Sequence, residues 1–448
     1  MNMFKYILSF GLVALLLVSC DDYADLDDVQ PINSVTPELA VTDKKSAQAA
    51  VIGLYDAMQN GTLSFDGWLA MPQYFSDECD FTGTFPTRLQ FGNFNVFPDN
   101  TTMAAVFTAF YSGINRCNNV IALIPEVEDP TLSEADINSF LAEAYFIRSM
   151  FYFYLIQGWD EVPLVTEPTR EVGLILEVPK NTRAEVVSQM VTDLTFALDN
   201  LADGLSSGVS VAAVNALLAR LHQVEGNHQE AYNHALAAIG GEGFDLTNFD
   251  YLSDEIFFLQ FAAIDANALA FFYGPAEFGG RHSIEPSRKL IDSYEDGDIR
   301  KGLSIVDDPE VASVPFGIKY DDFAGGISAG SDPIMFFRHA EMVLIAAESA
   351  ARAGDFADAN KWYNQVRNRA GLGDQTLDAN NFEDLILQER FVELAMEGGH
   401  RLWDLRRTGG ALDVLGPLGY QACDNVWPLP QREIDRNRNL VQNNCCNC

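Results

Sequence analysis

Basic residues are scarce in this chain of 448 residues. Twenty-eight lysines and arginines stand against 64 aspartates and glutamates, which gives a formal net charge of −36. Nucleic-acid binding depends on basic patches that displace counterions from phosphates, so this balance argues against a nucleic-acid partner. The acids are spread along the chain rather than gathered in one block, which is typical of a solvated acidic surface.

Long apolar runs are also absent except at the N-terminus, where "MNMFKYILSFGLVALLLVSCDD" carries one lysine, Lys5, and then an apolar run over 7–18. That run is shorter than the roughly 20 residues of a membrane-spanning helix and has the layout of an export signal. Leu17-Val18-Ser19-Cys20 resembles the lipobox of bacterial lipoproteins. We predict a signal peptide over 1–19 and a lipidated Cys20; the alternative is a plain signal peptide with an incidental cysteine.

The segment after Cys20, "DDYADLDDVQPINS", is acidic and lacks helical or alternating periodicity. Such a composition predicts a tether, which we place at 20–42. In some Gram-negative lipoproteins an acidic stretch directly after the cysteine accompanies display on the cell surface, and this stretch resembles it.

Patterns that hold cofactors are missing as well. The terminal "NCCNC" has no histidine nearby and lacks the two C-x-x-C pairs of a zinc site, and no glycine-rich loop suits a phosphate. We expect no metal and no cofactor. Because export permits disulfides, we predict instead a bridge from Cys423 to one of the terminal cysteines.

The dominant period of the remaining chain is helical, and strand signals are few and short. Residues 139–159 are apolar on nearly every helical face, which predicts a buried helix that ends near Gly158. A second helix follows Asn181, which we expect to be its N-cap, with apolar residues at helical spacing up to Leu201.

Two segments share one pattern of two helices joined by glycine and a polar residue, with an alanine four positions after the polar residue. These are Gly226-Asn227 with Ala231, and Gly354-Asp355 with Ala359. Small alanines allow close helix packing, as in tetratricopeptide units. We predict a mainly α fold in which tetratricopeptide-like helical hairpins form a scaffold that carries long loop-rich insertions.

The insertions are rich in aromatic residues. Segments 61–100 and 271–333 combine aromatics with glycine, asparagine and proline and show no helical period. Loops held by a rigid scaffold are a common location for binding groups. We therefore expect both segments to be loops that contribute to a binding site.

The stretch "QERFVELAMEGGHRLWDLRR" at 388–407 carries four acids, four arginines and a histidine in twenty residues. A helix from Phe382 to about Glu397 would place Glu389, Glu393 and Glu397 on one face, where they repel unless cations meet them. The cations at hand are Arg390, Arg401, Arg406 and Arg407 nearby, and Arg367 and Arg369 at the end of the preceding helix. No nucleophile or separated carboxylate pair indicates catalysis. We predict a structural ion-pair cluster; its members are Glu389, Arg390, Glu393, Glu397 and Arg401.

Several segments follow one another in a familiar order: "AEAYFIRSMFYFYLIQGWDEVPLV", "PSRKLIDSYEDGDIRK", "FRHAEMVLIAAESAARAGDFADANKWYNQVRNRAGL", the 388–407 stretch and "VWPLPQREIDRNRNLVQN". Together and in this order they resemble the SusD/RagB family of surface nutrient-binding lipoproteins. The chain departs from the family at its end, where Cys445 and the residues after it replace the usual Asn-Pro-Gly-Tyr. The resemblance implies one domain over 43–448, with a helical half at about 43–240, a loop-rich insertion at about 241–335 and a C-terminal hairpin with family motifs at about 336–448.

The resemblance also implies a function without catalysis. The resemblance implies that the protein covers a TonB-dependent (SusC-like) outer-membrane barrel, as family members do. It would capture an oligosaccharide, or a peptide as in some members, and pass it to the transporter. The expected location is the outer membrane, anchored through Cys20 and facing the exterior. Family ligand sites lie on variable loops, so the motif match carries over no ligand residue.

A glycan site must therefore be inferred from chemistry, which calls for aromatic platforms beside polar groups. The aromatic candidates are Trp68, Tyr74, Phe81, Phe85, Tyr273, Phe278 and Tyr320, with Trp68 as the first choice. The polar candidates are Asp77, Asp80, Arg88, Asn93 and Arg281, and Asp77 has a structural alternative. Each aromatic has the alternative of packing beneath its loop.

Two other functions remain open from the residues. A lipid-anchored glycoside hydrolase would need two carboxylates facing each other across a cleft at roughly 5 to 10 Å. A tetratricopeptide-like scaffold that binds peptides or proteins is the reading to prefer if the aromatic segments prove buried.

Overall fold

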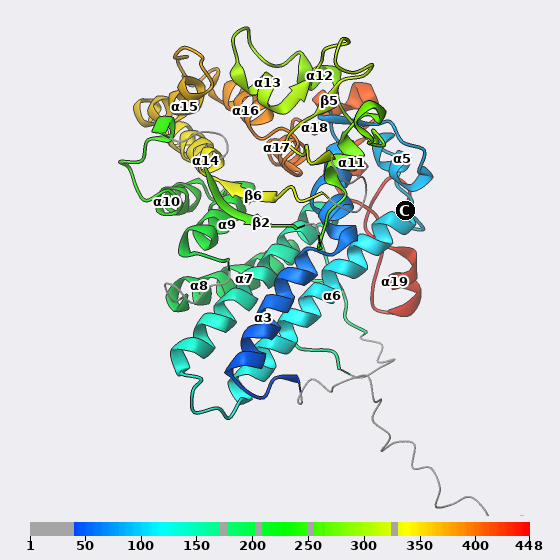
Figure 1. Cartoon of the computed structure of the whole chain (residues 1–448), viewed down its shortest axis with the longest axis vertical. Helices are drawn as coiled ribbons and strands as arrows, with labels where there is room; N and C mark the ends of the chain where they lie inside the picture. The colour runs from blue at the N-terminus through cyan, green and yellow to red at the C-terminus, as the bar shows by residue number, and fades with distance from the viewer. Residues whose placement is uncertain (1–39, 171–176, 202–207, 249–253, 263, 324–329) are drawn as a thin grey trace, which may run out of the picture.

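The computed structural model describes residues 40–170, 177–201, 208–248, 254–262, 264–323 and 330–448. Cys20, the signal peptide and most of the predicted tether lie outside these ranges. The described chain is mainly helical: long helices make up one end of an elongated body, and short helices, strands and loops cap the other (Figure 1). No helix in the described ranges is long and apolar enough to cross a membrane.

The N-terminal half contains most of the long helices. They are α3 (Lys44–Met58), α6 (Thr101–Leu123), α7 (Glu134–Trp159), α8 (Arg183–Asn200), α9 (Val211–Val224) and α10 (His228–Ala238). Shorter elements lie between α3 and α6: the π-helix η1 (Leu63–Ala70), α4 (Met71–Tyr74), β1 (Cys79–Phe81) and α5 (Pro86–Gly92).

The loop-rich insertion and the C-terminal part follow. The insertion carries β2 (Glu255–Leu259), α11 (Leu269–Tyr273), β3 (Ile284–Pro286), α12 (Arg288–Ile291), α13 (Ile299–Ser304), β4 (Ile305–Val306), β5 (Phe316–Gly317) and β6 (Ile334–Arg338). The last helices are α14 (His339–Arg352), α15 (Phe356–Arg369), α16 (Phe382–Glu393), α17 (His400–Arg407), α18 (Ala411–Leu415) and α19 (Gln431–Arg436). Single 3-10 turns occupy Ile124–Glu126, Leu246–Asn248, Ala276–Phe278, Gly416–Leu418 and Ala422–Asn425.

Helix α7 is the core element, as its sequence predicts. It is apolar on almost every face, is buried from Ser139 to Trp159 apart from Tyr145, and packs against α6 and α8. A capping box begins it, in which Ser133 accepts a hydrogen bond from the backbone N–H of Asp136. The predicted end near Gly158 is confirmed, since the helix ends one residue later, at Trp159.

The predicted N-cap of α8 is wrong by one residue. Thr182 caps the helix, and its capping box with Glu185 satisfies two backbone N–H groups. The side chain of Asn181 instead accepts a hydrogen bond from the backbone N–H of Leu164 at 3.0 Å. The sequence Thr-Arg-Ala-Glu carries this capping-box signal, which takes precedence over a preceding asparagine.

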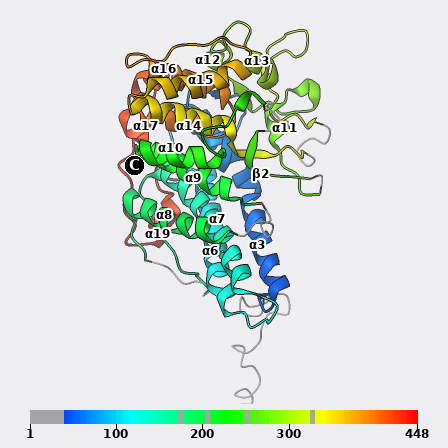
Figure 2. The ribbon, with the colours of Figure 1, turned by 90° about the vertical axis from the view of Figure 1, so that its left-hand side faces the viewer.

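Both predicted hairpins are present, and they are neighbours in space. Gly226 and Gly354 sit at the turns with φ of 74° and 79°, a region that glycine enters without steric cost. Ala231 and Ala359 are fully buried where the helices cross. Figure 2 shows α9, α10, α14 and α15 one above another, so the two hairpins stack although over a hundred residues separate them.

The prediction that 61–100 is a loop is wrong for residues 63–74 and for α5, and 271–333 likewise contains short helices and strands between its loops. Residues 63–74 form η1 and α4, and every residue of the two helices is buried. The run is apolar almost throughout, so it has no polar face that would mark a helix on a 3.6-residue period. Only its burial against α6 and the β6 region, which the sequence of the segment does not reveal, makes it helical.

Strands are few and short in the described ranges, as predicted. They form three two-stranded antiparallel sheets, β1 with β3, β2 with β6 and β4 with β5. In the first, Cys79 pairs with Pro286 and Phe81 with Ile284. This sheet fastens the first aromatic segment to the second.

The charged stretch at 388–407 is a buried ion-pair network, as predicted, although α16 ends at Glu393 rather than near Glu397. Glu389 accepts from Arg300 at 2.6 Å, Glu393 from Arg338 at 3.0 Å, and Glu397 from Arg338 at 2.7 Å. Arg338 also bonds Asp254, which precedes β2. The carboxylates of α16 therefore hold the loop-rich insertion onto the helical scaffold.

The cations that meet these carboxylates are not all the predicted ones. Arg390 pairs with Asp404 and Arg401 with Asp77, both at 2.7 Å, so neither neutralises the three glutamates. Arg367 and Arg369, the predicted cations at the end of the preceding helix, do meet Glu389 at 3.3 Å and Glu393 at 2.5 Å. Arg300 and Arg338, which lie far away in sequence, complete the network. A local charge count therefore predicts the cluster and its nearby cations but not the distant ones.

The cysteine prediction is confirmed in the structure. Cys423 bonds Cys446, and a second disulfide joins Cys445 to Cys448. Cys79 and Cys117 are buried free thiols.

One buried carboxyl lies outside the ion-pair network. Glu78 is 1% exposed; its Oε1 accepts from the backbone N–H of Met396 at 2.8 Å, while its Oε2 has no hydrogen-bond partner among the described residues. Burial raises the pKa of Glu78 to about 8, even though Lys319 and Arg401 lower it. Glu78 is therefore largely protonated at neutral pH.

We predict that Arg338→Met destabilises the protein by about 3 kcal/mol or more, because it removes the cation that the buried carboxylates of Asp254, Glu393 and Glu397 share. The control is Arg116→Met, which removes an exposed pair with Asp56 at 2.9 Å and should change the free energy of unfolding by less than about 1 kcal/mol. Urea denaturation measures both. Equal effects in the two variants would contradict a structural role for the network.

We predict that Glu78→Gln flattens the dependence of stability on pH. The folded pKa of Glu78, about 8, exceeds its unfolded value near 4.3, so protonation stabilises the fold. That contribution is complete at low pH and is lost as pH rises through about 8, on the order of 1 kcal/mol per pH unit. The free energy of unfolding of Glu78→Gln minus that of the wild type should therefore increase from pH 5 to 8. The exposed control Glu128→Gln should show no such trend, and a constant difference for Glu78→Gln would refute the assignment.

Candidate functional site

Four of the seven predicted aromatic platforms are core residues. Trp68 and Tyr273 are 0% exposed, Tyr74 is 1% and Tyr320 is 3% exposed. Trp68 donates from Nε1 to the carbonyl of Met58 at 2.9 Å and packs among rings of α6, α7 and β6. Contrary to the prediction, Trp68, Tyr74 and Tyr273 present no exposed ring to a ligand, and Tyr320 is almost fully buried, although it lines a concavity beside β2 and β6.

Two predicted aromatics do reach the surface. Phe85 is 37% exposed and Phe278 is 41% exposed, whereas Phe81 is partly buried against Tyr74. Phe85 directly precedes α5, and Phe278 lies in a tight turn in which the backbone N–H of Gly280 donates to Pro275. They come from the two predicted aromatic segments.

The structure brings these segments together, as predicted. Thr82 donates through its backbone N–H to Ser283 and through its hydroxyl to His282. The guanidinium of Arg281 lies 4.4 Å from the centroid of the Phe85 ring. We call the exposed surface formed by Phe85, Phe278 and Arg281 the loop face; α5 and α11, which flank it, lie at the same side of the molecule (Figure 1).

Arg88 supports this face from below. Its guanidinium lies 4.7 Å from the Phe85 ring centroid and binds both carboxylate oxygens of Asp66, at 2.7 and 2.8 Å. It also lies over Phe65 and Phe272, whose rings stack at 4.1 Å. Because its charge is already paired, Arg88 positions Phe85 rather than offering a free cation.

Arg281 differs from Arg88. It is exposed, and none of the described residues forms a hydrogen bond or ion pair with its guanidinium. Its donors are therefore available to hydroxyl groups of a ligand, while its planar face rests on Phe85. This combination of ring and guanidinium suits a sugar, which has an apolar C–H face and polar edges.

The other predicted polar residues divide into exposed and structural ones. Asp77 is buried and binds Arg401 through both carboxylate oxygens, so its structural alternative is the correct one. Asp80 lies on β1 opposite Glu285. The residue as a whole is exposed, but its carboxyl is partly desolvated, which raises the pKa of Asp80. Asn93 is exposed at the end of α5.

Two phenylalanines that sequence reasoning missed complete the cluster. The ring of Phe278 stacks on Phe323 at 5.6 Å and lies 5.5 Å from Phe316. Both partners belong to the predicted aromatic segment, but nothing in the local pattern distinguishes a supporting ring from an exposed one.

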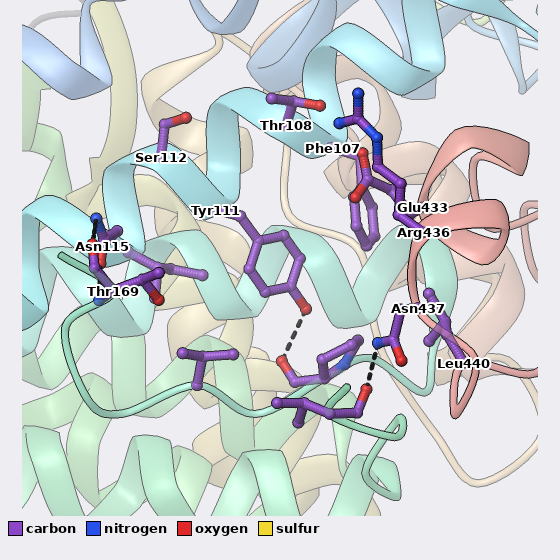
Figure 3. Close-up of a pocket in the computed structure, with 14 residues that line it drawn as sticks. Phe107, Thr108, Tyr111, Ser112, Asn115, Thr169, Glu433, Arg436, Asn437 and Leu440 are labelled. Atoms are coloured by element: carbon purple, nitrogen blue, oxygen red, sulfur yellow. Dashed lines mark hydrogen bonds between the residues drawn. The ribbon is translucent and has the colours of Figure 1, made fainter. Parts of the chain in front are cut away.

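A separate concave surface lies between α6, α19 and the chain at 163–170 and 177–178. We call it the α6–α19 pocket; its volume is about 650 Å³. Figure 3 shows Tyr111 at its centre, with Asn115 and Thr169 on one side and Glu433 and Arg436 of α19 on the other. Its residues come from three segments far apart in sequence, and no motif could have joined them.

A third concavity of about 550 Å³ lies beside β2 and β6 and is lined partly by Phe258, Leu303, Lys319 and Asp332. Phe258 is 37% exposed. Among the described residues, no group of histidine, cysteine and carboxylate side chains has the arrangement of a metal site.

Comparison with known proteins gives two family matches. Residues 86–222 match a family model described as starch-binding associating with outer membrane, and residues 316–422 match the model of the SusD family. SusD-like proteins P2 and P38 of Formosa agariphila are each 26% identical to the chain, and each alignment covers at least 98% of this chain and 99% of the relative.

Solved structures show the same fold. A laminarin-binding SusD-like protein superimposes with a TM-score of 0.78 at 23% identity, covering 90% of this chain and 99% of that one. Surface glycan-binding protein A of Bacteroides thetaiotaomicron, solved with laminarihexaose, gives 0.75 at 21% identity over 90% of this chain and 100% of that one.

The hairpin scaffold, the buried charged stretch at 388–407 and these matches agree on one assignment. The chain belongs to the SusD/RagB family.

Proposed function

We propose that the chain is a cell-surface lipoprotein that captures an oligosaccharide on its loop face and passes it to a TonB-dependent outer-membrane transporter. The exposed pair of Phe85 and Arg281, held together by two separate segments, is the observation that supports the site. The glycan class is supported by relatives whose names state that they bind laminarin or glycans.

The loop face suits a neutral saccharide better than an anion. Arg281 is the exposed cation of this surface, while Asp80 and Glu285 lie on the adjoining strands and add negative charge. Rings at Phe85 and Phe278 supply the apolar surface on which sugar C–H groups pack. The face captures its ligand by stacking and hydrogen bonding, and its affinity depends on how well the loops are preformed.

The loops of this face are well preformed. The β1–β3 sheet, the Asp66–Arg88 pair and the backbone bonds from 281–283 to 271–274 fix both segments in place. Little conformational entropy is then lost on binding, which favours useful affinity from a small contact area.

The lipid anchor and the transporter partnership rest on the lipobox and the family resemblance. The described chain begins at the foot of α3, at the end of the molecule opposite the loop-rich insertion (Figure 1). A tether that leaves from this end would keep the loop face away from the attachment point.

We predict that Phe278→Ala and Arg281→Ala each weaken binding of a neutral oligosaccharide by about tenfold, or ~1.4 kcal/mol. Calorimetric titration of the purified full chain in detergent, with a panel that includes laminarihexaose, measures this. Phe258→Ala is the matched control, since Phe258 is equally exposed but lies at the β2–β6 concavity. Loss of binding in the control alone would place the site there and refute the loop face.

We also predict that Cys20→Ala moves the protein from the membrane to the soluble fraction, because the acyl chains that anchor it can no longer be attached. Cell fractionation measures the distribution. Cys117→Ala, which removes a buried free thiol, is the control and should stay in the membrane. Retention of the Cys20 variant in the membrane would contradict lipid anchoring.

A further inference from the structure

The α6–α19 pocket is a built site that the loop face does not use. Three sets of hydrogen bonds fix its walls: Tyr111 donates to the carbonyl of Pro163 at 2.7 Å, Asn115 and Thr169 exchange side-chain-to-backbone bonds at 3.2 and 2.7 Å, and Asn437 donates to the carbonyl of Val178 at 2.7 Å. Figure 3 shows two of these bonds, from Tyr111 and Asn437 to the backbone carbonyls of the neighbouring chain. The cavity is therefore preformed, and its volume lies within the roughly 300 to 1,000 Å³ of small-molecule sites.

The walls carry polar side chains, two of which have no side-chain hydrogen-bond partner among the described residues. Thr108 has a buried hydroxyl oxygen with no hydrogen-bond partner among the described residues. Arg436 is exposed, and no hydrogen bond or ion pair to it occurs in the described part of the chain. Ser112 is exposed on the next turn of α6.

Aromatic surface stands beside these polar groups. The rings of Phe107 and Tyr111 lie 4.9 Å apart on one wall, and Leu440 lies on the other. The pocket thus combines an apolar wall with hydroxyl and guanidinium groups, which is the combination that a sugar ring requires.

The charges of the pocket favour a neutral ligand. Its lining has one acid, Glu433, and one base, Arg436, so their charges balance. Glu433 also lies 3.5 Å from Arg432 at the rim. An anion would be repelled by the acid and a cation by the base, whereas hydroxyl groups can accept from Arg436 and donate to Glu433.

We propose that the α6–α19 pocket is a second saccharide subsite, which binds neutral sugar units independently of the loop face. The ligand class rests on the proposed function, while the pocket itself rests on its own geometry. Two subsites on one chain raise the effective concentration for an oligosaccharide long enough to reach both, or retain two short ones at once.

The test is calorimetric titration of the full chain in detergent with the neutral oligosaccharide that binds best in the panel that includes laminarihexaose. Ser112→Trp fills the pocket from an exposed position, and Ser188→Trp on α8 is the matched control for an exposed serine-to-tryptophan change. We expect two sugars per wild-type and Ser188→Trp chain, and one per Ser112→Trp chain. Arg436→Ala, a smaller change at an exposed residue, should weaken the second binding event about fivefold or more.

The outcomes separate the two proposals. Identical stoichiometry and affinity in wild type, Ser112→Trp and Arg436→Ala would overturn the second subsite and leave the loop face standing. Absence of binding by the wild type to every neutral oligosaccharide would overturn the glycan class for both. Melting temperatures of the variants within a few degrees of the wild type confirm that a lost site does not reflect misfolding.

Discussion

The buried ion pairs between α16 and the loop-rich insertion are the constraint on which the rest of the structure depends. Glu393 and Glu397 lie in or just after α16, yet their shared cation Arg338 ends β6 and also binds Asp254 before β2. Each charge is removed from water, so each is tolerated only while its partners are in place. The network therefore fixes one register between scaffold and insertion.

This fixed register also positions the loop face. With the insertion held on the scaffold, β3 pairs with β1, and the turn that carries Phe278 and Arg281 meets the segment that carries Phe85. The acidic surface and the buried charges thus have different roles: exposed carboxylates face solvent, while buried ones position the loops. The highly charged stretch at 388–407 contributes to the fold through its ion pairs.

The fold was predictable where one segment carries its own signal. Helix α7 is apolar on every face, and the hairpins at Gly226 and Gly354 have turn residues and buried alanines at a fixed spacing. Residues 63–74 carry no such signal, because their helical form depends on burial between elements distant in sequence. Arg300 and Arg338, the distant partners of Glu389, Glu393 and Glu397, could not be predicted for the same reason.

For the site, the sequence predicted which segments meet but not which rings face outward. Trp68 has the largest ring of its segment and is fully buried. Phe85 and Phe278 are partly exposed, because Arg88 and Phe323 pack against their rings without enclosing them. Exposure of an aromatic depends on its neighbours in space. The α6–α19 pocket was invisible in the sequence, since α6, the chain at 163–170 and 177–178, and α19 form it jointly.

A crystal structure of the protein with a bound neutral oligosaccharide tests the central claim most directly. The account predicts sugar density across Phe85 and Phe278, with ring hydroxyls hydrogen-bonded to Arg281. Density confined to the β2–β6 concavity, with the loop face empty at saturating sugar, would contradict it.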